Sequence, residues 1–470
     1  MIAAASVRNR RQVLVGAGLG VYASAVALAP GVAAKAILCA PLLLLPLLWI
    51  LVRTPAVWLA LFFACALLAP PLPVALGDSG PHIALLAAAA GLFIGFLRLG
   101  EWRIRLDALA LSLIALWCVF AFSLTMAALY SGLAIAAGSL ARVLLFGISI
   151  YVFLYVRDGP VRWAPRESRG AVRWLFWAAA LSALFACVDF YFQFPAPAGY
   201  EEQFVWLESG VYRRAQGVFY EASTLGNLCA FFLEMIAVAL CRPKQERPVS
   251  GLAMAAGGTA LAAALVLSFS RASLVNVAVA FCILLWLNRR RIQWGRMATA
   301  ATLFGAGAAT VLMTAFPLFA RAAWLRVSAA FEYFSESPNA VLSGRITSWQ
   351  TLLGFIASHP WHALLGVGYK TLPYSDFIGA KAVGDNTYLT LLVETGVLGL
   401  AAVVALNVAI LVAAYRASRS DDSLQAFCGT WMFCFWAGQC VQMLSADLLT
   451  YWRILPVYFF ALALSVRRPA

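Results

Sequence analysis

Long apolar runs separated by short basic segments make up most of the chain. A helix needs roughly 20 apolar residues to cross a bilayer. The pattern therefore predicts an all-α polytopic membrane protein with 12–14 transmembrane helices, the lower number applying if two weaker runs are re-entrant or interfacial. The predicted spans lie near residues 12–29, 34–51, 56–75, 81–97, 106–127, 135–156, 173–192, 222–241, 250–269, 272–288, 297–317, 386–414, 424–442 and 453–466.

Composition supports this class. The chain is 63% hydrophobic and 11% charged, whereas a soluble domain is about half apolar and a quarter charged. The net charge of +14 does not indicate nucleic-acid binding, because the basic residues cluster in short loops between spans. Topology and lipid headgroups explain such clusters better.

The basic residues also predict an orientation. With a cytoplasmic N-terminus, 23 of the 34 Lys and Arg residues fall in inner loops, which places both termini in the cytoplasm. We divide the chain into residues 1–317 with eleven spans and an outer loop near 193–221, a periplasmic helical loop at 318–385, and C-terminal spans at 386–470. The outer basic residues are Lys35, Arg142, Arg213, Arg214, Arg271, Arg321, Arg326, Arg345, Lys370, Lys381 and Arg453.

The second long outer loop has helical patterns of its own. One interfacial helix is predicted from the spacing of Trp324, Val327, Phe331 and Phe334. A second helix, capped by Ser343, would present Ile346, Trp349, Leu353 and Ile356 on one face. Together they predict a small helical cap on the outer leaflet.

The outer arginines carry the candidate chemistry. A guanidinium stays charged and is costly near hydrocarbon, so it needs an anionic partner or a watery cavity. Outside the cytoplasm there is no pool of ATP, and a synthetic reaction there needs a donor with its own leaving group, such as a polyprenyl diphosphate. The candidate diphosphate-binding residues are Arg214, Arg213, Arg271, Arg345, Arg142 and Arg453. The alternative is a structural role on headgroups or carboxylates.

Fixed cations stabilise the charge that develops on a leaving diphosphate, so no metal and no cofactor are expected. No Asp-x-Asp pair lies on the outer face. A transferase also needs a base for the acceptor hydroxyl. Asp385 leads the candidates, with helix capping as its alternative role. The others are Glu221, His359, Glu394, His362, Glu201 and Glu202.

Four ordered motifs resemble the O-antigen ligase and O-antigen polymerase superfamily. They are Arg-Ala-Gln-Gly-Val-Phe from Arg214, Ser-Arg-Ala-Ser from Ser270, Ser-Gly-Arg-Ile-Thr-Ser-Trp from Ser343 leading to His359-Pro and Gly366-Val-Gly, and Asp385-Asn386 followed by Gly396 and Gly399. They cover roughly residues 210–400.

The resemblance implies a metal-independent, inverting transfer of glycan from undecaprenyl diphosphate, with Arg214 and Arg271 on the diphosphate. In the family the fourth motif commonly begins with a His, which is taken as the base, whereas this chain has Asp385. The implied partners are the lipid-linked glycan and an acceptor, which is the lipid A-core for a ligase and a lipid-linked repeat for a polymerase.

We therefore predict a GT-C-like glycosyltransferase of a bacterial inner membrane, with its site on the periplasmic side. The alternative is a lipid-linked oligosaccharide flippase or other secondary transporter. A transporter's charges should line a path that reaches both faces, whereas the arginines outside the cytoplasmic loops gather at the outer end.

Overall fold

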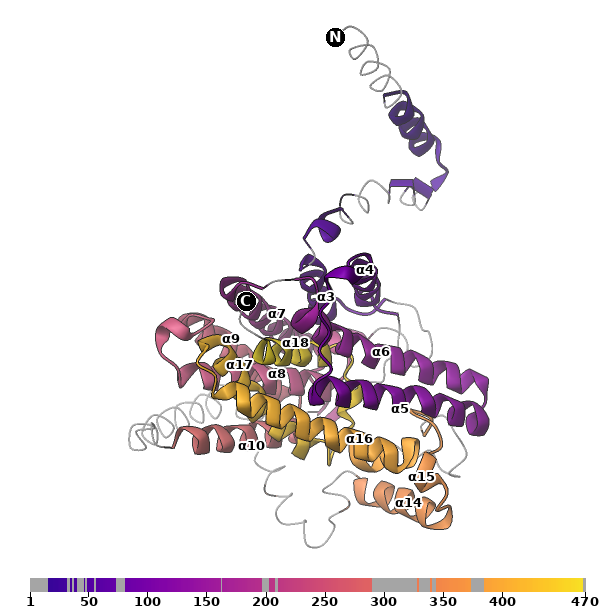
Figure 1. Ribbon diagram of the computed structural model, residues 1–470, viewed down its shortest axis with the longest axis vertical. Helices are drawn as coiled ribbons and strands as arrows, with labels where there is room; N and C mark the ends of the chain where they lie inside the picture. The colour runs from indigo at the N-terminus through magenta and orange to yellow at the C-terminus, as the bar shows by residue number, and fades with distance from the viewer. Residues whose placement is uncertain are drawn as a thin grey trace.

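The computed structural model describes residues 16–31, 34–35, 38–39, 46, 49–54, 56–72, 81–161, 163–196, 203–207, 210–289, 328, 339, 344–372 and 384–467. Helices dominate these residues (Figure 1). One short hairpin, of β1 (Phe204–Leu207) and β2 (Gly210–Arg213), interrupts them. The predicted all-α polytopic class is confirmed.

The elements are α3 (Val57–Leu68), α4 (Ala84–Leu97), η1 (Leu99–Glu101), α5 (Ala108–Ser131), α6 (Leu133–Asp158), α7 (Pro165–Phe192), β1 (Phe204–Leu207), β2 (Gly210–Arg213), η2 (Gly217–Phe219), α8 (Ala222–Leu240), η3 (Lys244–Glu246), α9 (Gly251–Leu267), α10 (Arg271–Asn288), α14 (Arg345–Ser358), α15 (His362–Leu365), α16 (Thr387–Ser418), α17 (Ser423–Gln442), η5 (Leu448–Thr450) and α18 (Leu455–Val466).

Six helices of the described residues are long and apolar enough to cross a bilayer: α5, α6, α7, α8, α10 and α16. Shorter apolar helices are α3, α4, α9, α18 and residues Gly16–Leu28. Each coincides with a predicted span, as does α17. The predicted span 297–317 and most of 34–51 lie outside the described residues, so the total number of spans stays a prediction.

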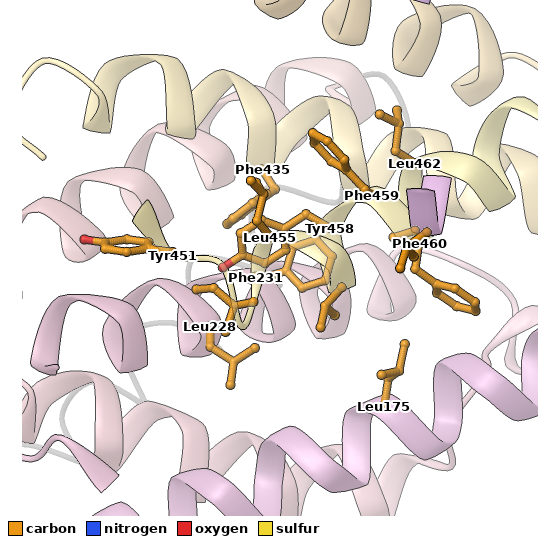
Figure 2. Packing of buried hydrophobic residues seen from close by; sticks show 14 of the residues in the cluster. Leu175, Leu228, Phe231, Phe435, Tyr451, Leu455, Tyr458, Phe459, Phe460 and Leu462 are labelled. Atoms are coloured by element: carbon orange, nitrogen blue, oxygen red, sulfur yellow. The ribbon is translucent and has the colours of Figure 1, made fainter. Parts of the chain in front are cut away.

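The buried core extends through most of the described helices, and Figure 2 shows the part of it where α8, α17 and α18 meet. Phe231 on α8 is fully buried, and its ring centroid lies 4.1 Å from that of Trp431, 4.7 Å from that of Phe435 and 4.5 Å from that of Tyr458. The indole N–H of Trp431 donates to the Phe231 carbonyl oxygen at 2.7 Å. Close packing and hydrogen bonds of this kind hold membrane helices together, because lipid removes the hydrophobic drive between them.

Four buried amide side chains tie α8, α10 and α17 into one unit. Asn227 Nδ2 and Asn276 Nδ2 each donate to Gln439 Oε1 at 2.8 Å. They also donate to Gln442 Oε1, at 2.8 and 2.9 Å. A polar network inside a low-dielectric bundle is costly to rearrange. It therefore fixes the beginning of α10 relative to its neighbours.

The two long loops differ in part from the expectations. The first contains the hairpin of β1 and β2, with Phe204 paired to Arg213. In the second, α14 corresponds to the second predicted helix, but Gly344 rather than Ser343 occupies its N-cap. Its buried side chains are Leu352 and Phe355, while Leu353 is 54% exposed, so the packed face is rotated from the predicted one. Apart from Ser328, the first predicted helix lies outside the described residues.

Candidate functional site

A cavity of about 440 Å³ lies where the N-termini of α8, α10, α14 and α16 converge. Their N-caps are Glu221, Ser270, Gly344 and Asn386. The first turn of a helix leaves backbone N–H groups unpaired and carries a partial positive charge. Four such ends around one hollow favour an anionic ligand.

Two cavity arginines come from the contact between the hairpin exit and the α9–α10 turn. Phe269 has a left-handed backbone (φ 51°), which reverses the chain and makes Arg271 the first residue of α10. Arg214 Nε donates to the Ser268 carbonyl oxygen of this turn at 2.7 Å. The Ala215 N–H donates to the Leu267 carbonyl at 3.0 Å. Hydrogen bonds thus hold Arg214 and Ser268, which are 54 positions apart in the sequence, together beside the cavity.

Arg142 and Arg345 also line this cavity. Arg142 comes from α6, and its charge acts on the carboxyl group of Glu221. Arg345 is the first residue of α14, and its Nε lies 3.4 Å from Asp385 Oδ2. Four of the six candidate arginines therefore surround one hollow.

The two other candidate arginines lie elsewhere. Arg213 forms a buried ion pair with Asp189 of α7, with Nη2 and Oδ1 2.7 Å apart. Arg453 donates to the backbone carbonyls of Ala66, Val218 and Ala69 at 2.9, 2.6 and 2.8 Å. Both side chains hold the bundle together, and neither lines the cavity.

Three candidate bases, Glu221, Asp385 and Glu394, line the cavity. Glu221 accepts hydrogen bonds from the hydroxyls of Ser223 at 3.0 Å and Thr224 at 2.6 Å. Burial raises the pKa of its carboxyl group against those bonds. Burial also raises the pKa of Asp385, and the charge of Arg345 opposes that rise. A carboxylate with a raised pKa is a stronger base once it is ionised.

His359 lies away from the cavity-lining residues. Its ring stacks on Phe355 with the centroids 4.8 Å apart, and its Nδ1 lies 3.2 Å from the Phe355 carbonyl oxygen. His362 lies in α15 beside the same ring. Glu201 and Glu202 lie outside the described residues.

Two residues that were not predicted to belong to the site also line the cavity. Lys370 and Asp447 form an ion pair in its wall. Glu394, a minor candidate base from the sequence, is buried there together with Thr390. One signal pointed to Lys370: it is an outer basic residue directly after the glycine-rich turn Gly366-Val-Gly-Tyr.

No group of three or more His, Cys, Asp and Glu side chains among the described residues is arranged to hold a metal ion. The cavity wall instead pairs its acidic groups with basic groups, as in Arg345–Asp385 and Lys370–Asp447. The arrangement can bind an anion through guanidinium groups while carboxylates stand beside it.

Comparison with known families identifies the segment that carries part of this site. Residues 256–404 match the O-antigen ligase family. The match confirms the predicted resemblance to the O-antigen ligase and polymerase superfamily. No curated protein matches the chain. The matched segment contributes Arg271, Arg345, Lys370, Asp385 and Glu394 to the cavity wall.

The rest of the wall comes from outside the matched segment: Arg142, Arg214, Glu221 and Asp447 precede or follow it. The cavity therefore depends on helices beyond the matched segment. In general terms, the match supports a multi-pass membrane protein of the lipid-linked glycan ligase or polymerase type.

Proposed function

We propose that this chain is a glycosyltransferase that moves a glycan from undecaprenyl diphosphate to an acceptor at the periplasmic face of a bacterial inner membrane. The acceptor is the lipid A-core, as in a ligase, or a second lipid-linked saccharide, as in a polymerase. The observation that carries the proposal is the single cavity that brings Arg142, Arg214, Arg271 and Arg345 together at four helix N-termini.

The charge of the cavity suits a diphosphate. Forked guanidinium groups form paired, charge-assisted hydrogen bonds with phosphate oxygens. The helix ends add partial positive charge that is fixed before the reaction begins. Negative charge grows on the diphosphate as the glycosidic bond breaks, so these groups stabilise the transition state more than the ground state.

In the proposed step the acceptor hydroxyl oxygen attacks the anomeric carbon of the donor sugar. The bond between that carbon and the diphosphate oxygen breaks, and undecaprenyl diphosphate leaves with the electron pair. Asp385 takes the hydroxyl proton, for which its raised pKa is an advantage. A single displacement of this kind inverts the anomeric configuration.

The test is a reconstituted transfer assay. The purified protein in lipid nanodiscs is mixed with an undecaprenyl-diphosphate-linked glycan and, in separate reactions, with lipid A-core or with more lipid-linked glycan. Glycosylated lipid A-core indicates a ligase, and a ladder of longer lipid-linked chains indicates a polymerase. Reactions without the undecaprenyl-diphosphate-linked glycan serve as the negative control. Absence of both products with the wild-type protein overturns the proposal.

A further inference from the structure

The loop Gly366–Leu372 is docked against a break in α16. Gly396 has φ 70° inside that helix, and a Cβ there would come within 2.1 Å of the Leu364 carbonyl oxygen. The N–H groups of Val367 and Gly368 donate to the carbonyls of Val393 and Glu394, at 3.1 and 2.8 Å. The break in α16 thus leaves backbone carbonyl groups free to accept hydrogen bonds from the loop, as a neighbouring β-strand would.

Tyr369 anchors the same loop to α5 and α6. Its ring stacks on Phe120 with the centroids 4.0 Å apart and the planes 11° apart. Its N–H donates to Ser123 Oγ at 3.2 Å, and its carbonyl oxygen accepts from Ser139 Oγ at 2.5 Å. Three helices therefore define the position of the residue that follows.

That residue is Lys370, and its backbone is left-handed (φ 58°) although it carries a side chain. Such a conformation is uncommon outside glycine, asparagine and aspartate, and it persists where the surroundings enforce it. The ammonium group forms an ion pair with Asp447, and its charge also acts on the carboxylate of Glu394. The backbone N–H of Lys370 also donates to the carboxyl group of Glu394, so a strained lysine tied to two acidic side chains indicates a built position in the cavity wall.

Two further polar groups face the same hollow without a full set of partners. Thr390 and Glu394 lie one turn apart on α16, are 2% and 1% exposed, and line the cavity. Among the described residues, Thr390 Oγ1 and Glu394 Oε2 have no hydrogen-bond partner. Buried polar atoms are nearly always paired, so these two point to a ligand.

We propose that Lys370, Glu394 and Asp447 form the subsite that binds the hydroxyl groups of the acceptor saccharide. This assignment rests on the proposed glycosyltransferase function. The two carboxylates can accept hydrogen bonds from sugar hydroxyls and the ammonium group can donate to them, and the excess of negative charge disfavours a second phosphate. In this assignment the cavity arginines form the donor side, which binds the diphosphate, and Lys370, Glu394 and Asp447 form the acceptor side.

The test is a binding measurement with three probes on protein in nanodiscs. Undecaprenyl diphosphate alone reports the donor side. Binding of lipid A-core tests the acceptor of a ligase. Binding of a lipid-linked glycan, added while undecaprenyl diphosphate saturates the donor side, tests the acceptor of a polymerase. Glu394→Gln is compared with Glu234→Gln, which neutralises a carboxyl group that is equally buried within α8 and does not line the cavity.

Glu394→Gln is expected to weaken acceptor binding at least tenfold and to leave the affinity for undecaprenyl diphosphate within twofold of wild type. Glu234→Gln should change neither. Lys370→Asn removes the ammonium group while keeping a residue that tolerates the left-handed backbone, and it should weaken the same acceptor. The Lys370→Asn variant provides the test if Glu394→Gln does not fold.

The outcomes separate the two proposals. A wild-type protein that binds undecaprenyl diphosphate but neither acceptor probe overturns the subsite, as does equal acceptor binding by wild type, Glu394→Gln and Lys370→Asn. If Lys370→Asn weakens the diphosphate probe instead, the lysine belongs to the donor side and the division of the cavity is wrong. A wild-type protein that does not bind undecaprenyl diphosphate contradicts the proposed function itself.

Discussion

Arg345 Nε lies 3.4 Å from Asp385 Oδ2, so a candidate diphosphate-binding cation also acts on the ionisation of the candidate base. Burial raises the pKa of Asp385, and the guanidinium opposes that rise by favouring the charged form. The pair therefore links binding of the diphosphate to deprotonation of the acceptor. This link should be visible in the pH dependence of transfer.

If Asp385 acts as the base, only its carboxylate form is active, and transfer increases as pH rises through its pKa. The acid limb of kcat/KM should then have its midpoint above the ordinary pKa of an aspartate. Arg345→Gln removes the opposing charge and should move this limb further to higher pH. Arg103→Gln, at an exposed site away from the cavity, should leave it in place. A limb that moves to lower pH in Arg345→Gln contradicts the coupling.

Replacing the base itself should have a larger effect on turnover than on binding. Asp385→Asn keeps the shape of the side chain and should lower kcat about 10²- to 10⁴-fold, which is the usual contribution of a general base. The dissociation constant for undecaprenyl diphosphate should change little. Ser223→Ala, which removes one hydroxyl donor from Glu221, should cost less than tenfold. A nearly normal kcat in Asp385→Asn assigns the base elsewhere.

Arg271→Ala separates the enzyme from a lipid transporter. Loss of one charge-assisted bond to a diphosphate costs about 1.5–3 kcal/mol, so binding of undecaprenyl diphosphate should weaken about tenfold to a hundredfold. Transfer should fall while lipid-linked glycan still crosses the bilayer in cells. Arg103→Ala provides the matched control. Accumulation of the lipid-linked glycan in the inner leaflet in Arg271→Ala would instead support the transporter.

The sequence predicted the parts of this molecule that depend on local pattern. Apolar runs of sufficient length give helices wherever they occur, so α5 to α10 and α16 to α18 follow from hydropathy. Guanidinium groups beside hydrocarbon need a polar hollow, which made Arg271 a candidate. Its place at the beginning of α10 agrees with that reasoning.

The sequence did not predict that the neighbouring residues Arg213 and Arg214 have different surroundings. Arg213 ends β2 and Arg214 follows it, and successive side chains of an extended chain point in opposite directions. One arginine therefore meets Asp189 on α7, and the other meets the cavity. Whether Arg213 or Arg214 faces the cavity depends on how the hairpin packs against the helices, and tertiary contacts determine that packing.

Lys370 and Asp447 illustrate the same limit over a longer distance. They are 77 residues apart, and their pairing depends on the break at Gly396 that docks the loop Gly366–Leu372. A glycine within an apolar helix pattern is compatible with a straight helix or with a break. The hydrophobic pattern alone therefore did not assign either residue to the site.

Gly396→Ala tests that break. A side chain there meets a left-handed backbone and the Leu364 carbonyl, so we expect a loss of about 1–3 kcal/mol of stability or more and weaker acceptor binding as the loop shifts. Gly354→Ala, in α14 with open space around the added methyl group, should be neutral or slightly stabilising. Thermal unfolding of both variants provides the comparison. Equal melting temperatures would mean that the break is not required.

Arg213 should behave as a structural residue. It pairs with Asp189 at 2.7 Å, and each side chain is 4% exposed, so Arg213→Ala leaves a carboxylate buried without its partner. Breaking such a pair costs about 3–5 kcal/mol, whereas replacing both members with apolar residues costs much less. Denaturant unfolding should therefore show a large loss for Arg213→Ala and substantial recovery for the double variant Arg213→Met with Asp189→Leu. The recovered double variant should bind undecaprenyl diphosphate like wild type. A recovered fold with weakened diphosphate binding would instead place Arg213 with the cavity arginines.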